Sequence, residues 1–186
     1  MNYLRKILVR SEIKLVKLDK LSGQKTQIYS IVADNDDKSL FEHFLAENDE
    51  VYHDELLEIL TRIKSISNKE GAREHLFKKA EGKLGDGVEA LYDESKRKLR
   101  LYCIRYGSVL LVLGGGGAKT VRALQDDPKL KENNYLLREI SKRLSQAMQD
   151  GDLKWNSSFD DFTGDFILKI QTITKTFKPY NNDTFR

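Results

Sequence analysis

The sequence predicts an α+β protein in which helices pack on a small antiparallel sheet. Two stretches, 11–33 and 88–113, contain segments that alternate between apolar and polar residues, the two-residue period of a half-buried strand. Two others, 51–66 and 132–148, repeat their apolar residues at helical spacing. The chain of 186 residues is 39% apolar and 33% charged, which is the composition of a globular domain rather than of a disordered chain.

The first strands are expected to form a hairpin. Residues 11–18 alternate, residues 26–33 read as a second strand, and the turn signal Ser22-Gly23 lies between them. Helices follow, because Ser39 with Glu42 three residues later fits a capping box. That pattern starts one helix, and the apolar stripe of 51–66 predicts a second.

The middle of the chain is expected to pass from helix to sheet. A second capping pattern, Ser67 to Glu70, predicts a short helix that extends to about residue 79. Strands are then expected at 88–92, 99–106 and 109–113, as an antiparallel meander.

The glycine run 114–117 is expected to break the sheet and to act as a flexible exit from its last strand. The last clear helix is expected over 132–148, and Gly151 ends it. Residues 152–161 are polar and loop-like, and a late strand falls within 165–177.

Charge is divided unevenly along a chain whose net charge is only +3. Residues 34–60 hold ten acidic residues and one lysine, a local −9, whereas 96–143 hold twelve basic and four acidic residues, a local +8. This division suits a basic face for a polyanion beside an acidic helical layer, and it equally suits two solvated faces.

A cytoplasmic location is expected. No apolar run is long enough to span a bilayer, and residues 1–10 lack the core of a signal peptide. The single cysteine, Cys103, cannot form an internal disulfide and shares the parity of Leu99 and Leu101, so it is expected to be a buried thiol.

The order and spacing of these elements resemble the HigB-like branch of the RelE/ParE toxin superfamily. The resemblance covers roughly residues 26–148. Its pieces, in chain order, are the strand 28–32, Phe41-Glu42-His43-Phe44-Leu45, the helix 51–66, Lys83-Leu84-Gly85, the meander strands 99–103 and 110–113, Ala118-Lys119-Thr120 and the helix 132–148. It implies a RelE-like toxin domain over 26–150, preceded by a strand extension (1–25) and followed by a C-terminal extension (151–186).

The resemblance also implies a function. Such a protein is the toxin of a type II toxin–antitoxin pair, a metal-free and ribosome-associated mRNA endoribonuclease without cofactors. Its expected partners are a cognate antitoxin protein, mRNA and the ribosome, with no membrane involved. Two alternatives stay open, a gyrase-directed inhibitor of the ParE type and a non-catalytic RNA- or protein-binding module.

Metal-free RNA cleavage uses the 2′-hydroxyl of the RNA as nucleophile, so the protein has to orient it, move protons and neutralise charge on the phosphate. Alternation along 99–106 directs Arg100, Tyr102 and Tyr106 to the face opposite the core. By motif position, Arg100 and Lys119 match the family's catalytic cations, and Tyr102 is a base-stacking or proton-transfer candidate. Further RNA-binding candidates are Arg97, Lys98, Arg105, Tyr106 and Arg122.

Two positions depart from the family pattern. Ala118 stands where the turn has its first lysine, and Gly116 stands where an aromatic residue precedes it, which leaves catalytic competence open. A phosphate-binding loop is disfavoured, because Leu113 and Ala118 replace the glycines at both ends of that motif. The three histidines, His43, His53 and His75, share no metal-ligand spacing and are expected to be solvated helix residues.

Overall fold

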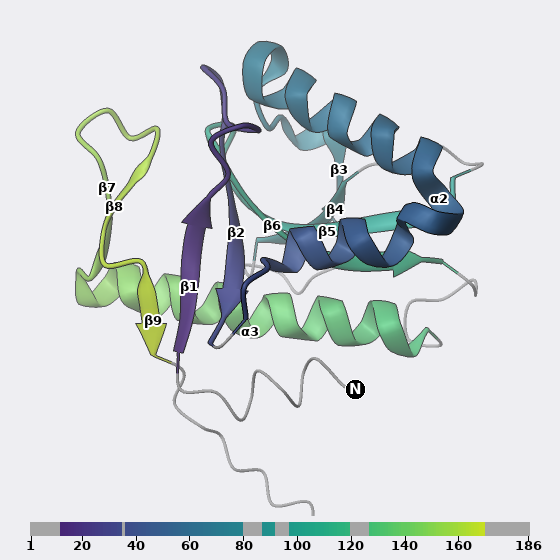
Figure 1. Cartoon of the computed structure of the whole chain (residues 1–186). Helices are drawn as coiled ribbons and strands as arrows, with labels where there is room; N and C mark the ends of the chain where they lie inside the picture. Colours follow the sequence, from purple (N-terminus) through teal and green to yellow (C-terminus); the bar gives the residue numbers. More distant parts are fainter. Residues whose placement is uncertain (1–11, 35, 80–86, 92–96, 120–126, 170–186) are drawn as a thin grey trace, which may run out of the picture.

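The computed structural model describes residues 12–34, 36–79, 87–91, 97–119 and 127–169. These residues form an α+β fold with one seven-stranded mixed sheet, of strand order β3-β4-β5-β6-β2-β1-β9. One long helix covers each face of the sheet, α2 on one side and α3 on the other, and a two-stranded hairpin, β7–β8, projects beside it (Figure 1). The expected small antiparallel sheet is therefore wrong in both size and pairing.

The predicted N-terminal hairpin is confirmed. β1 (Glu12–Lys17) and β2 (Gln27–Ala33) pair antiparallel, from Ile13 opposite Ala33 to Lys17 opposite Tyr29. On its other side β2 pairs with β6 (Leu110–Ala118), and this pairing is parallel. The sheet is mixed because the chain crosses over from β2 through α2 before it returns to β6.

The two helices expected within 39–66 are present as the two halves of α2 (Leu40–Ser65), which meet at a kink at Tyr52, where the backbone is not helical. Its start is as predicted, since the Ser39 side chain accepts a hydrogen bond from the Glu42 N–H and the Glu42 carboxylate accepts one from the Ser39 N–H. The two halves carry separate apolar stripes because the kink turns one against the other.

The short helix expected over 67–79 is wrong. A π-helical turn, η1 (Ile66–Glu70), a 3₁₀ turn, η2 (Glu74–Leu76), and a short edge strand, β3 (Phe77–Lys78), occupy that range. The Ser67 carbonyl accepts hydrogen bonds from the N–H groups of both Lys25 and Thr26. Tertiary bonds of this kind override the local capping pattern.

The meander is confirmed as β4 (Val88–Leu91), β5 (Leu99–Tyr106) and β6, but β6 continues through all four glycines to Ala118. The glycine run therefore neither breaks the sheet nor forms a flexible exit. Past Gly151, the expected loop includes β7 (Leu153–Trp155), which pairs with β8 (Phe162–Gly164). The late strand is β9 (Ile167–Lys169), which pairs with β1 at the edge of the sheet.

Each helix buries one face of the sheet. Alternate residues of β5 divide between two cores, because Leu99, Leu101 and Cys103 pack under α2 whereas Tyr102 and Ile104 pack under α3 (Pro128–Asp150). The expectation that the second face of β5 is open to solvent is therefore wrong. The predicted burial of Cys103 is confirmed, and burial raises the pKa of its thiol.

In the part of the chain that the structure describes, neither long helix has the extended apolar run that crossing a membrane requires.

Candidate functional site

The site lies where the parallel strands β2 and β6 end. α2 follows β2 and α3 follows β6, and the two helices lie on opposite faces of the sheet. The recorded pairing of β2 with β6 stops at Ser30 opposite Leu113, after which the two strands part. A crevice between diverging parallel strands, with one helix leaving on each face, is where open α/β sheets bind their ligands.

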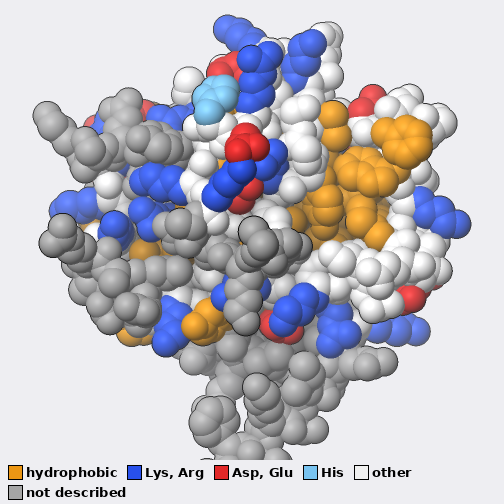
Figure 2. Space-filling view, turned by 180° about the vertical axis from the view of Figure 1, so that it is seen from behind, with side chains coloured by type: hydrophobic (Ala, Val, Ile, Leu, Met, Phe, Trp, Pro, Cys, Tyr) orange, Lys and Arg blue, Asp and Glu red, His pale blue; other side chains and the backbone are white. Residues whose placement is uncertain are grey.

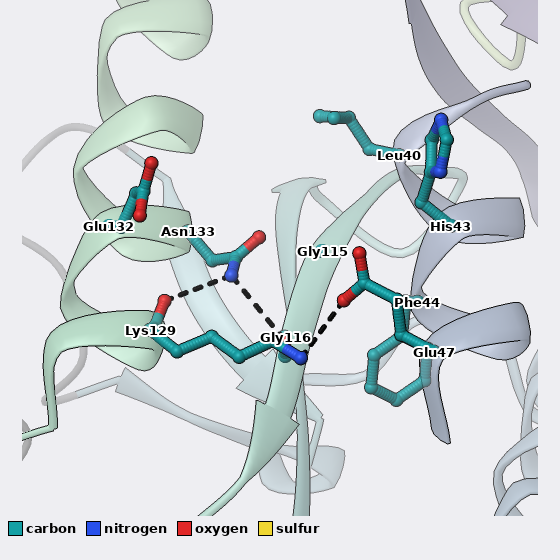
Figure 3. Close-up of a pocket in the computed structure, with 9 residues that line it drawn as sticks. All are labelled: Leu40, His43, Phe44, Glu47, Gly115, Gly116, Lys129, Glu132 and Asn133. Atoms are coloured by element: carbon teal, nitrogen blue, oxygen red, sulfur yellow. Dashed lines mark hydrogen bonds and ion pairs between the residues drawn. The ribbon is translucent and has the colours of Figure 1, made fainter. Parts of the chain in front are cut away.

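A pocket of about 280 Å³ occupies this crevice (Figure 3). Its walls are the first two turns of α2 and the first turn and a half of α3, and its floor is the glycine stretch of β6. The lining residues are Leu40, His43, Phe44, Glu47, Gly115, Gly116, Lys129, Glu132 and Asn133.

The glycines of β6 are needed because α3 approaches the strand closely. A Cβ on Gly115 would lie 2.1 Å from the Asn133 Oδ1, and one on Gly114 would lie 2.9 Å from the Leu137 methyl groups. Gly116 faces its own neighbouring strand, and a Cβ there would lie 1.9 Å from the Arg100 carbonyl oxygen, beside the register shift between Leu101 and Cys103. The run therefore shapes the floor of the pocket through close packing.

Polar contacts join the two walls. The Lys129 Nζ lies 2.9 Å from the Glu47 carboxylate, so an ion pair connects α3 with α2 across the pocket (Figure 3). The Asn133 amide donates to the Lys129 carbonyl at 2.9 Å and to the Gly116 carbonyl at 3.4 Å. These contacts hold α3 against the open edge of β6.

His43 lies in the pocket wall, and its Nε2 is 3.1 Å from the Asp36 carboxylate, whose side chain is only 8% exposed. An imidazole whose ring orientation a carboxylate fixes is a suitable group for proton transfer. At the preceding residue, bonds from the Ser39 N–H and hydroxyl keep the pKa of Glu42 below its ordinary value, so its carboxylate stays charged at the start of α2. No set of three or more His, Cys, Asp or Glu residues capable of holding a metal ion occurs within the described ranges.

Four predicted residues meet at the same end of the sheet as the pocket. Arg100 pairs with Gly117 in the β5–β6 ladder, and the Lys119 N–H donates to the Lys98 carbonyl at 2.8 Å. Arg97, next to Lys98, forms an ion pair with Glu58 of α2. The Lys129 side chain also reaches this end, since its Cδ would be 3.3 Å from a Cβ on Gly117.

Two of the three predicted catalytic residues are buried. Tyr102 has no solvent exposure and belongs to the core under α3, so its ring cannot stack on a base in this structure. Arg100 is only 6% exposed, because it shares the face that α3 covers. The prediction of an exposed face was wrong because alternation identifies the two sides of a strand but not whether a second helix lies over one of them.

Arg105 and Tyr106 lie at the opposite end of β5, away from the pocket. Arg105 is bound by the Glu89 carboxylate at 2.7 and 3.0 Å, and this hydrogen bonding raises the pKa of its guanidinium. The Tyr106 ring packs edge-on against Trp155 and Phe162, and burial raises the pKa of its hydroxyl.

Apolar side chains gather on the side of the molecule where the β7–β8 hairpin lies (Figure 2). Arg122 falls outside the described residues.

Sequence reasoning missed the wall residues His43, Glu47, Lys129, Glu132 and Asn133. One signal was available, because His43, Glu47 and the apolar Leu40 and Phe44 are three or four residues apart and share one side of a helix. No local sequence pattern indicated that β2 and β6 pair in parallel, which brings α2 and α3 together at one edge of the sheet.

The comparisons with known proteins add no family assignment. No family model, no curated protein and no solved structure matches this chain.

Proposed function

We propose that this chain is an mRNA endoribonuclease of the HigB/RelE toxin type, acting at the β2–β6 crevice. The carrying observation is the convergence of Lys98, Lys119 and Lys129 on the end of β6 that holds the pocket. Cations clustered beside a polar crevice suit a single-stranded polyanion whose backbone lies on the rim. The resemblance supports the same reading, because strand, helix, meander and helix occur in its order.

Each of these residues has its own role in the proposed cleavage. Lys119 and Lys98 neutralise the phosphate, whereas Lys129 is paired with Glu47 in the wall of the pocket. His43, oriented by Asp36, takes the proton from the attacking 2′-hydroxyl or returns one to the leaving oxygen. Arg100, buried beneath α3, acts as a positioning residue for the end of β5 rather than as a group that touches RNA.

The test is induction of the chain in a bacterial host followed by primer extension on cellular mRNA. We expect new 5′ ends inside translated frames, loss of these ends with Lys119→Ala or His43→Ala, and no change with Lys142→Ala. Lys142 is a matched control, because it is an exposed lysine of α3 that pairs with Glu139 far from the pocket. Intact mRNA with arrested growth would contradict cleavage and favour an inhibitor of another target, such as gyrase.

A second candidate is a non-catalytic RNA- or protein-binding module with the same crevice. The observation that favours it is the burial of Arg100 and Tyr102, the residues that the resemblance assigned to catalysis. Under this reading, induction leaves mRNA intact and growth normal, while RNA binding still depends on Lys98 and Lys119.

A further inference from the structure

The pocket is rich in hydrogen-bond acceptors. Both Asn133 amide hydrogens are directed at carbonyl groups, those of Lys129 and Gly116, so the Asn133 Oδ1 faces the cavity as an acceptor (Figure 3). This oxygen lies directly over Gly115, whose missing side chain makes room for it. Within the described residues, no donor to this oxygen is recorded.

Two carboxylates add to this character. Glu47 and Glu132 line the cavity from opposite walls, and the one lysine among the lining residues, Lys129, is held by Glu47 at 2.9 Å. An ionised carboxylate only accepts hydrogen bonds, and an ammonium group only donates them. Because Glu47 is paired with Lys129, Glu132 leaves the lining with a net negative charge, so a group that presents donors to the Asn133 oxygen suits the interior better than a phosphate does.

The residues at the rim of the pocket are positively charged, unlike the carboxylates of its interior. Lys98 and Lys119 lie at the ends of β5 and β6, two or three residues beyond the glycine floor. At about 3.4 Å per residue, Lys119 lies roughly 10 Å along the strand from Gly116, and Lys98 is its neighbour on the adjacent strand. A purely cationic ligand, such as a polyamine, would have to pass these lysines. A donor-bearing ring attached to a phosphate matches both the interior and the rim.

We propose that this pocket binds a guanine base of single-stranded RNA. Guanine presents an imino and an amino donor side by side, and the Asn133 oxygen that faces the cavity is an acceptor for them. A volume of about 280 Å³ is slightly below the usual range for drug-sized ligands, so it suits one base with its phosphate outside. The inference rests on the proposed function, since it names the base that the nuclease holds beside the cleaved bond.

The experiment is a titration of the full chain with 5′-GMP, 5′-IMP, 5′-AMP and guanosine, followed by amide NMR. We expect GMP to bind best and IMP, which lacks the amino donor, to bind at least about fivefold more weakly. Guanosine should lose only the part of the affinity that depends on Lys98 and Lys119. The shifted amides should include those of Gly115, Gly116 and Asn133.

Two variants test the geometry. Gly115→Ala should abolish GMP binding, because its Cβ displaces the Asn133 oxygen. If Gly115→Ala does not fold, Asn133→Ala removes the same acceptor without crowding the floor, and Gln146→Ala, an exposed amide near the end of α3, is the matched control. Equal affinity for GMP, IMP and AMP, or no saturable GMP binding up to about 10 mM, would overturn the proposal.

These experiments distinguish a failure of the guanine pocket from a failure of the proposed nuclease function. Cleaved mRNA without base discrimination, or cleavage that Asn133→Ala leaves unchanged in rate and position, removes the guanine pocket and keeps the nuclease. Intact mRNA with selective GMP binding removes the nuclease and leaves a guanine-binding module.

Discussion

At the scale of single residues, Tyr29 and Tyr106 differ in whether the hydroxyl has a hydrogen-bond partner. The Tyr29 hydroxyl donates to Asp161 at 2.6 Å, and Asp161 also binds Lys17 at 2.5 Å. The Tyr106 hydroxyl is enclosed by Trp155 and Phe162, and it has no hydrogen-bond partner among the described residues. A buried hydroxyl without a partner costs about 1–3 kcal/mol of desolvation.

Replacing each of these tyrosines with phenylalanine should change the free energy of unfolding in opposite directions. Tyr106→Phe should leave the free energy of unfolding unchanged or raise it by about 1 kcal/mol, because it removes an unsatisfied group. Tyr29→Phe should lower it by about 1–2 kcal/mol, because the Asp161 carboxylate loses a donor. Urea unfolding of both variants checks this, and a loss of stability in Tyr106→Phe as large as that in Tyr29→Phe would contradict it.

Asp161 also predicts a pH dependence. Burial opposes ionisation, yet hydrogen bonds from Lys17 and Tyr29 outweigh it and hold the pKa of the carboxyl below its ordinary value. A lowered pKa in the folded state contributes stability above the unfolded value, about 3.9, and loses it as the pH falls through the folded pKa. Asp161→Asn should therefore flatten the decline in stability below about pH 4. A decline as steep as that of the parent protein would show that Asp161 contributes nothing.

At the scale of elements, the four glycines of β6 have different roles, although they look alike in the sequence. Gly116 faces the Arg100 carbonyl, a rigid backbone atom, whereas Gly117 faces the flexible side chain of Lys129 at 3.3 Å. Gly114 and Gly115 face α3. A glycine run predicted flexibility from composition, but these residues lie in a paired strand because small side chains let a helix and a bulge approach it.

The difference between Gly116 and Gly117 is testable. Gly116→Ala should destabilise the fold by about 1–3 kcal/mol or more, because backbone cannot move aside cheaply. Gly117→Ala should cost less than about 0.5 kcal/mol, since Lys129 can change rotamer. Thermal and urea unfolding compare the two, and equal losses would show that the strand does not have this geometry.

The elements that were predicted correctly are those with local signals. The β1–β2 hairpin, the capped start of α2 and the strand 99–106 follow from alternation and capping alone. The π-helical turn at Ile66–Glu70 could not be predicted, because bonds to Lys25 and Thr26 fix it from elsewhere in the chain. The same holds for the site. Lys119 was predicted from motif position and Lys98 was named as an RNA-binding candidate, whereas the walls depend on which strands are neighbours.

At the scale of the whole molecule, the uneven charge of the sequence is partly cancelled in the fold. Acidic residues of α2 bind cations that precede β5 or begin α3, as in the pairs of Glu58 with Arg97 and Glu47 with Lys129. The Glu55 carboxylate accepts bonds from the N–H groups of Lys98 and Leu99. The acidic helix therefore lies against the basic end, and its carboxylates compete with any bound polyanion.

This arrangement predicts the salt dependence of RNA binding under the proposed function. Each phosphate contact on a single strand contributes about 0.7 to the slope of log affinity against log salt. Replacing both Lys98 and Lys119 with alanine should reduce that slope by about 1.4, whereas Lys142→Ala should leave it unchanged. Fluorescence anisotropy with a short single-stranded RNA at several salt concentrations measures the slopes, and equal slopes would place the RNA elsewhere on the surface.

The pairing of β1 with β9, and of β2 with β6, has a consequence for how the chain reaches this fold. Ser30 and Leu113 meet across 83 residues, and Glu12 meets Lys169 at the edge of the sheet. Contacts between such distant segments form late and slow the folding of small proteins. During synthesis the N-terminal hairpin leaves the ribosome early, and both of its edges stay unpaired until the partner strands have been translated. A chain translated from β1 towards β9 therefore exposes both edges of this hairpin until β6 and then β9 emerge, and an exposed strand edge can pair with other chains.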